Sequence, residues 1–162
     1  MPYAVLTVIL VVLDQLVKYQ VMTNIAPGEY VPFLPYILDL TYVQNTGAAF
    51  SILEEYTSLL TITSLAMSVL LALALRKNFF RHPLGKLTIT LLLAGAVGNL
   101  IDRALRGFVV DMFHVLFMKF AVFNVADICV VVGGIGAALY YLFLQSKLEP
   151  PEETHDHSET DS

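Results

Sequence analysis

Charged residues are scarce in this chain of 162 residues, at 14%, whereas hydrophobic residues make up 57%. The mean hydropathy is +0.71. A water-soluble domain of this size would not be so apolar, so the composition indicates a membrane protein. The basic residues neither form a patch nor alternate with aromatic residues, which argues against nucleic-acid binding.

Cysteine is almost absent, and several common catalytic motifs are missing. Cys129 is the single cysteine and lies in an apolar run, so a disulfide within the chain is excluded and a packing role is expected. The sequence contains no HExxH metal motif and no GxSxG nucleophile motif. Zinc-protease and serine-hydrolase chemistry therefore have no support.

The net charge of -5 comes from the end of the chain, because six of the fourteen acidic residues lie within residues 149–162. This segment begins close to a Pro-Pro pair and is otherwise polar. We expect it to be a disordered, acidic, cytoplasmic tail.

Four apolar stretches approach the roughly 20 residues that a membrane-spanning helix needs. They are residues 3–22, 57–75, 87–105 and 122–144. The first stretch has no basic leader and no small-residue cleavage site, so it is predicted to be a retained helix. We expect residues 1–148 to form one membrane-embedded domain.

Basic residues are unevenly distributed between the predicted helices. Residues 76–86 contain four of the nine, whereas residues 24–56 contain none. The positive-inside rule places the 76–86 loop in the cytoplasm. Both termini are then cytoplasmic, and residues 24–56 and 106–121 lie outside.

The two outer segments carry apolar stretches of their own. Residues 37–43 and 117–124 have strand character, and residues 47–53 suit a short interfacial helix. Small residues in the third and fourth predicted helices favour close packing between them. The predicted fold is an all-α membrane protein with four transmembrane helices, a small extracytoplasmic β-sheet and a short interfacial helix.

Several polar residues are predicted at the outer ends of these helices, although placing such residues in a membrane costs free energy. Polar residues in such positions usually face a functional site or pair with one another. In this chain they are Asp14, Lys18, Asn99, Asp102, Arg103, Asp111, Asn124 and Asp127. Asp14 and Lys18 share a helical face, either as a local ion pair or as part of a substrate-binding site. Asp102 and Arg103 either reach the headgroups or support the site. Asn124 suits an N-cap that also orients a carboxylate.

Asp111 and Asp127 are the candidate catalytic pair. Two close aspartates tend to share one proton, so that one acts as a base and the other as an acid. Such a pair can activate water against a peptide carbonyl. Asp127 would also suit the first turn of a helix as a simple dipole partner, and spacing alone leaves both roles open.

Five blocks of the sequence resemble the bacterial lipoprotein signal peptidases. They are LDQLVK (13–18), QNTGAAFS (44–51), GNLIDR (98–103), GFVVDM (107–112) and FNVADI (123–128). The blocks occur in the family's order relative to four apolar segments. Met112 is a small departure, since an aromatic residue is common there.

The resemblance implies an aspartyl endopeptidase of the bacterial cytoplasmic membrane, with its active site toward the outer face. Its substrates would be diacylglyceryl-modified prolipoproteins, cut just before the lipidated cysteine. Asp111 and Asp127 would be catalytic, with no metal or organic cofactor, in a monomer that contacts membrane lipid and is blocked by globomycin. Site-shaping positions carried over are Asp14, Lys18, Asn45, Gly47, Asn99, Asp102, Arg103, Asn124 and Ala126.

Two other functions fit the same polar residues. A proton-coupled transporter would use Asp14, Asp102 and Asp127 as a relay, but it should also carry polar residues at the bilayer midplane and on the cytoplasmic half. A non-catalytic assembly factor would bind a partner with this cluster. The assembly-factor hypothesis predicts that Asp111→Asn and Asp127→Asn each leave function nearly intact.

Overall fold

The computed structural model describes residues 1–47 and 57–149. Four helices within these ranges are long and apolar enough to cross a membrane, which confirms the four predicted segments. They are α1 (Pro2–Asn24), α2 (Thr57–Arg76), α3 (Pro83–Arg106) and α4 (Val125–Leu139), the last continued by a π-helical turn η3 (Tyr140–Leu144) and by α5 (Gln145–Leu148).

The ends of α3 and α4 follow from local chemistry. Pro83 opens α3 behind the His82 cap, and Gly107 ends it in the left-handed conformation with φ of 78°. Asn124 caps α4 through its side chain, so this helix begins at residue 125 rather than at the predicted 122.

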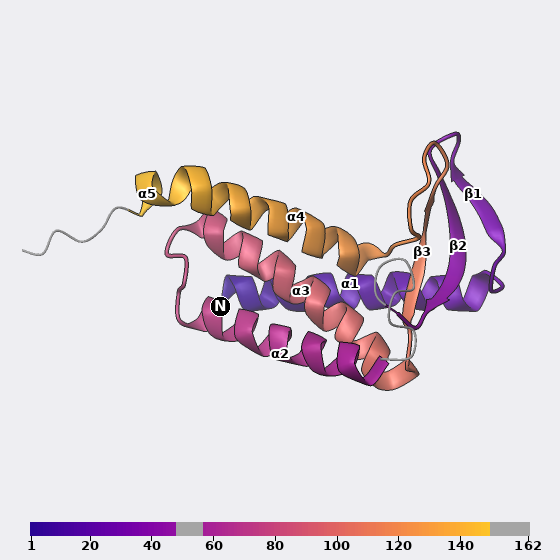
Figure 1. The fold of residues 1–162 in the computed structure, drawn as a ribbon, viewed down its shortest axis with the longest axis horizontal. Helices are drawn as coiled ribbons and strands as arrows, with labels where there is room; N and C mark the ends of the chain where they lie inside the picture. The colour runs from indigo at the N-terminus through magenta and orange to yellow at the C-terminus, as the bar shows by residue number, and fades with distance from the viewer. Residues whose placement is uncertain (48–56, 150–162) are drawn as a thin grey trace, which may run out of the picture.

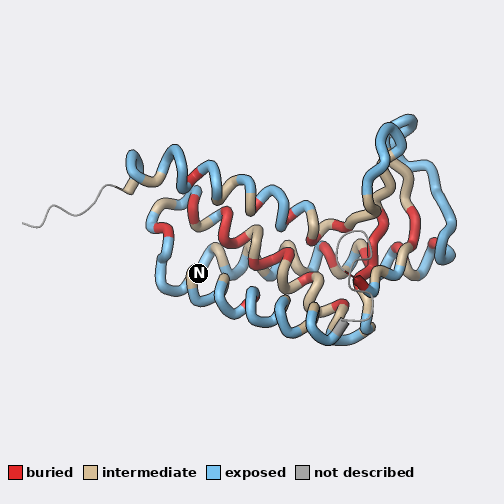
Figure 2. Tube along the Cα trace, in the orientation of Figure 1, coloured by how far each residue is buried: buried red, intermediate tan, exposed pale blue. Residues whose placement is uncertain are grey.

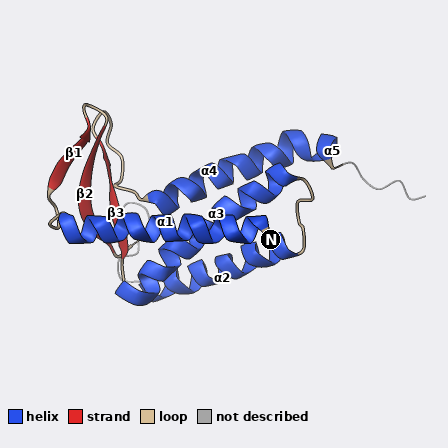
Figure 3. Ribbon diagram, turned by 180° about the vertical axis from the view of Figure 1, so that it is seen from behind, coloured by secondary structure: helices blue, strands red, loops and turns tan. Residues whose placement is uncertain are grey.

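Helix α3 lies at the centre of the bundle, packed against α1, α2 and α4 (Figures 1 and 3). Much of its surface is buried, whereas α2 is mostly exposed, as expected for a helix that faces lipid (Figure 2). Glycines permit the predicted contact between α3 and α4. A Cβ on Gly95 would lie 2.4 Å from the carbonyl oxygen of Ala126, and one on Gly133 would lie 2.8 Å from the amide nitrogen of Leu92.

A three-stranded antiparallel sheet stands at one end of the bundle (Figure 1). Its strands, in spatial order, are β1 (Tyr30–Leu34), β2 (Leu38–Asn45) and β3 (Val109–Val115). The prediction for residues 37–43 is confirmed by β2. The prediction for residues 117–124 was wrong: β3 lies before that segment, which only touches the sheet through a bridge between Phe113 and Phe123. Pairing with β2 selects Val109–Val115 as the strand.

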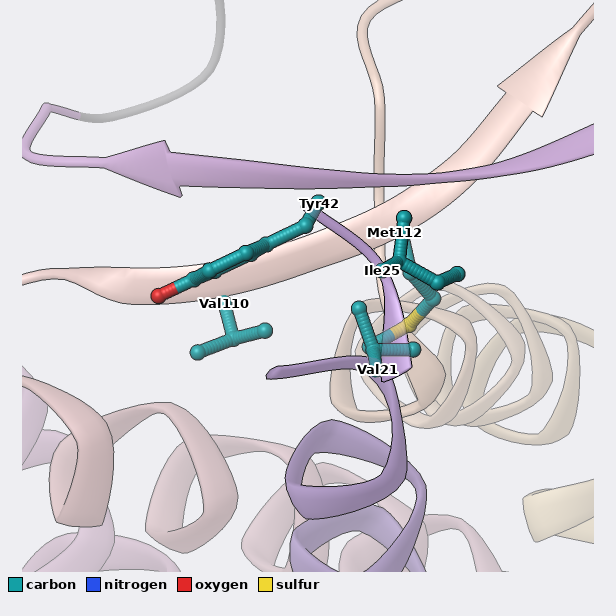
Figure 4. Close-up of a cluster of buried hydrophobic side chains, with 5 residues drawn as sticks. All are labelled: Val21, Ile25, Tyr42, Val110 and Met112. Atoms are coloured by element: carbon teal, nitrogen blue, oxygen red, sulfur yellow. The ribbon is translucent and has the colours of Figure 1, made fainter. Parts of the chain in front are cut away.

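The sheet is attached to the bundle by a small apolar core. Val21 and Ile25, at the end of α1, pack with Tyr42, Val110 and Met112 from the strands (Figure 4). Successive residues of a strand point to opposite faces. Burial of Val110 and Met112 against α1 therefore turns the intervening aspartate, residue 111, toward the other face of the sheet.

The start of α1 and the end of α5 lie at the end of the bundle away from the sheet, and so does the connection between α2 and α3 (Figures 1 and 3). At that end Glu149 accepts hydrogen bonds from the amide of His82, at 2.5 Å, and from the hydroxyl of Tyr140, at 2.7 Å. The remainder of the predicted tail, and all but the first residue of the predicted 47–53 helix, lie outside the described residues.

Candidate active site

A pocket of about 530 Å³ opens where the sheet meets the ends of α3 and α4. Its polar side is formed by Asn45, Gly47, Asn99, Arg103, Asp111 and Asp127. Its apolar side is formed by Val109, residues 120–123 and four residues of α4, namely Ile128, Val130, Val131 and Val132. Topology thus brings most of the candidate residues to one concave surface.

Asp111 is almost fully buried, at 2% exposure, and both of its carboxylate oxygens accept hydrogen bonds. Asn45 donates to Oδ2 at 2.8 Å, and Asn124 donates to Oδ1 at 2.7 Å. Burial raises the pKa of the Asp111 carboxyl to about 6, and the charge of Asp127 acts in the same direction against the two amide donors. This carboxyl can therefore hold or release a proton close to neutral pH.

Asn124 connects the two aspartates. Besides donating to Asp111, its side chain accepts a hydrogen bond from the backbone amide of Asp127 at 2.9 Å, and the backbone amide of Asn124 donates to Asp127 Oδ2 at 3.1 Å. These two bonds form a capping box at the start of α4. Asn124 thus both caps the helix and orients a carboxylate, the two roles expected for it.

Asn99 links Asp127 to the interior of the bundle. Its amide nitrogen donates to Asp127 Oδ1 at 2.8 Å, and its carbonyl oxygen accepts from Asn124 at 3.2 Å and from Lys18 at 3.0 Å. This arrangement fixes the orientation of the Asn99 amide, because Lys18 can only donate. Asp127 is therefore held by donors at both oxygens.

Asp14 and Lys18 form an ion pair of 2.9 Å that is shielded from solvent at 2% and 0% exposure. Asp14 also accepts from the backbone amide of Ala126 at 2.9 Å, and so fixes the first turn of α4 to α1. Among the described residues that line the pocket, neither Asp14 nor Lys18 appears. Of the two alternatives for this pair, the geometry favours the local ion pair.

Asp102 and Arg103 diverge although they are adjacent. Asp102 is fully buried beside Lys18, with 2.9 Å between the charged atoms, and accepts from the amide of Val110 at 3.1 Å. Arg103 lies in the pocket wall, and its guanidinium donates to the hydroxyl of Ser64 on α2 at 3.3 Å. Asp102 therefore holds the backbone of β3 from outside the pocket, whereas Arg103 is part of the pocket lining.

Sequence reasoning did not single out Gln15 or Arg106, which join the same buried cluster. Arg106 forms an ion pair with Asp102 and donates to Gln15 at 3.2 Å. The available signal was spacing, since residue 106 lies one helical turn after Asp102. Gln15 lies inside the LDQLVK block, and its amide nitrogen reaches Asp102 at 3.1 Å.

Comparison with known proteins identifies the scaffold. Residues 6–143 match the family model described as signal peptidase (SPase) II. The chain belongs to the signal peptidase II family. A lipoprotein signal peptidase of Streptococcus pneumoniae is 44% identical over 132 residues, covering 82% of this chain and 86% of that protein. One from Enterococcus faecalis is 41% identical over 145 residues, covering 90% and 89%.

Solved structures of bacterial membrane enzymes share the fold. A solved bacterial membrane enzyme superposes with a TM-score of 0.81 at 29% identity, covering 93% of this chain and 92% of that structure. A second has a TM-score of 0.80 at 30% identity. This chain is thus a multi-pass membrane peptidase of the signal peptidase II family, an aspartic type, built on four helices and a small sheet.

Proposed function

We propose that this chain removes the signal peptide from diacylglyceryl-modified prolipoproteins by cutting just before the lipidated cysteine, with Asp111 and Asp127 as the catalytic pair. The observation that carries the proposal is the contact of one side chain, Asn124, with both aspartates at the edge of a pocket with an apolar wall. Family membership supports the reaction class.

The chemistry follows from a shared proton. One carboxylate takes a proton from water while the water oxygen attacks the scissile carbonyl, and the protonated partner donates to the carbonyl oxygen. The tetrahedral intermediate then collapses, the C–N bond breaks, and the amine of the cysteine leaves with a proton from the pair. Asn45, Asn99 and Asn124 hold the two carboxyl groups in place through the bonds described above.

The pocket suits a substrate that arrives from the bilayer. Its apolar wall on α4 continues into side chains that are exposed on the helix surface, among them Val131 and Val132 at 56% and 53%. An apolar signal peptide and the acyl chains of its lipid can remain in a hydrocarbon environment along this wall. The scissile bond then meets the aspartates at the membrane boundary.

We further propose that the active site faces the outer side of the membrane, with both termini in the cytoplasm. The basic loop between α2 and α3 lies at the same end of the bundle as the start of α1 and the end of α5, opposite the sheet (Figure 3). On this proposal the enzyme acts as a monomer, needs no metal or organic cofactor, and is blocked by globomycin.

The reaction is tested with purified enzyme and a synthetic precursor in lipid vesicles, with and without the diacylglyceryl group. Mass spectrometry of the products should show a single cut before the cysteine, and the unmodified precursor should be turned over far more slowly. Equal turnover of both precursors would refute lipid recognition. A cut elsewhere would refute the assigned reaction.

A further inference from the structure

Arg106 completes the charge balance of a cluster buried behind the catalytic pair. Two carboxylates, Asp14 and Asp102, face two cations, Lys18 and Arg106, at the junction of α1 and α3. Both carboxylates and Lys18 are shielded from solvent, whereas Arg106 retains 24% exposure. Removing a single partner from such a cluster leaves a buried charge uncompensated, which is far more costly than the same loss at the surface.

Asp102 is the point at which this cluster meets the active site. Its Oδ1 is held by Arg106 and Gln15, and its Oδ2 accepts from Lys18 and from the amide of Val110. Val110 immediately precedes Asp111 in β3. The position of the Asp102 carboxylate therefore fixes the backbone that carries one catalytic aspartate.

A second connection runs to the other aspartate. Lys18 lies 2.9 Å from Asp102 and donates to Asn99 at 3.0 Å, and Asn99 in turn donates to Asp127 at 2.8 Å. A Lys18 ammonium drawn toward an undercompensated Asp102 would weaken its bond to Asn99. Both catalytic aspartates thus depend on how Asp102 is neutralised.

We propose that Arg106, held by Gln15, is a positioning residue of the peptidase: it neutralises Asp102 and so keeps Asp111 and Asp127 in their reactive geometry. This inference rests on the proposed catalytic pair. A plainer role exists, since a basic residue in the last turn of a helix is favoured by the helix dipole. The dipole role predicts that the effects of changing Arg106 and Asp102 add, whereas charge compensation predicts that they do not.

The test compares Arg106→Gln, Arg106→Lys and the double variant Asp102→Asn with Arg106→Gln, using cleavage of the lipid-modified precursor and thermal unfolding in detergent. Arg106→Gln should lower kcat by at least about tenfold with KM nearly unchanged. The lysine variant should recover most of kcat. In the double variant, the loss of thermal stability should be smaller than the sum of the two single losses.

Arg76→Gln is the matched control, because Arg76 is an exposed last-turn arginine at the other end of the bundle, and it should leave both kcat and the unfolding midpoint unchanged. Wild-type kcat in the folded Arg106→Gln variant, or additive losses of stability, would overturn the inference. The comparison of thermal stabilities between the single and double variants needs no substrate. It therefore tests the charge coupling between Arg106 and Asp102 even if the proposed reaction fails. A failed reaction would appear separately, as an inactive wild type.

Discussion

Gly98 of α3 leaves no room for a side chain beside Asp14 of α1: a Cβ at position 98 would lie 2.7 Å from Asp14 Oδ2. It would also lie 3.2 Å from the Cβ of Ala126 on α4. This glycine therefore allows three helices to meet at the buried ion pair, and the same approach lets Asp14 bind the first turn of α4.

Gly98→Ala should therefore destabilise the protein by about 1–3 kcal/mol, the usual range for overpacking, and should lower activity because α4 carries Asp127. Thermal unfolding in detergent measures the loss. Gly134→Ala is the control, since its Cβ would meet only Leu92 Cδ2 at 3.9 Å. Equal midpoints for the two variants would show that the close contact at Gly98 is unimportant.

Asn124 combines two tasks that substitutions can separate. Asn124→Ser keeps a short side-chain oxygen for the helix cap but loses the amide that donates to Asp111, whereas Asn124→Ala loses both. We expect kcat to fall by about 10- to 100-fold in each, the equivalent of one charge-assisted hydrogen bond. The alanine variant should in addition be less stable than the serine variant by about 1 kcal/mol.

Steady-state kinetics and thermal unfolding of the two variants check this separation. A serine variant with wild-type kcat would show that the bond from Asn124 to Asp111 has no part in catalysis. If the serine variant were as unstable as the alanine variant, the side-chain oxygen at position 124 would not stabilise the start of α4 as a cap.

The pKa of Asp111 predicts a pH dependence of stability. Its pKa in the folded protein, about 6, lies above the ordinary aspartate value of 3.8, so between these pH values the folded state binds more protons than the unfolded state. The free energy of unfolding must then fall as pH rises through this window, by about 3 kcal/mol in total. Below about pH 4 this loss of stability should be absent, and above about pH 6 it should be complete.

Asp111→Asn removes this titration while the other ionisable groups remain. The difference in unfolding free energy between this variant and the wild type should therefore shift in favour of the variant from pH 4 to pH 7. Chemical denaturation at several pH values gives the difference. A difference that stays constant across the window would contradict the raised pKa.

The four spans could be predicted from composition because a membrane helix is defined by length and hydropathy alone. The boundary of α3 was set too late, at residue 87, since Lys86 interrupts the apolar run. The helix nevertheless starts at Pro83, where His82 supplies the cap. The third strand was missed because residues 117–124 are equally apolar. Only its register with β2 places Val109–Val115 in the sheet.

The candidate site was predictable as a set of residues but not as a network. Depth in the membrane places Asp111 and Asp127 at one level, yet their connection through Asn124 depends on the third strand returning beside α4. Gln15 and Arg106 were missed for a related reason. Helical spacing puts Arg106 beside Asp102. Gln15, however, is separated from Asp102 by 87 positions and from Arg106 by 91, so its contacts with them follow only from the tertiary fold.

The catalytic pair is the central claim, and single-turnover cleavage of a lipid-modified precursor by Asp111→Asn and Asp127→Asn tests it most directly. Enzyme in excess over substrate removes product release from the measurement, and thermal unfolding shows that each variant is folded. We predict no cleavage product from either folded variant. Cleavage by both at a rate near that of the wild type would contradict the account and would favour a site elsewhere in the chain.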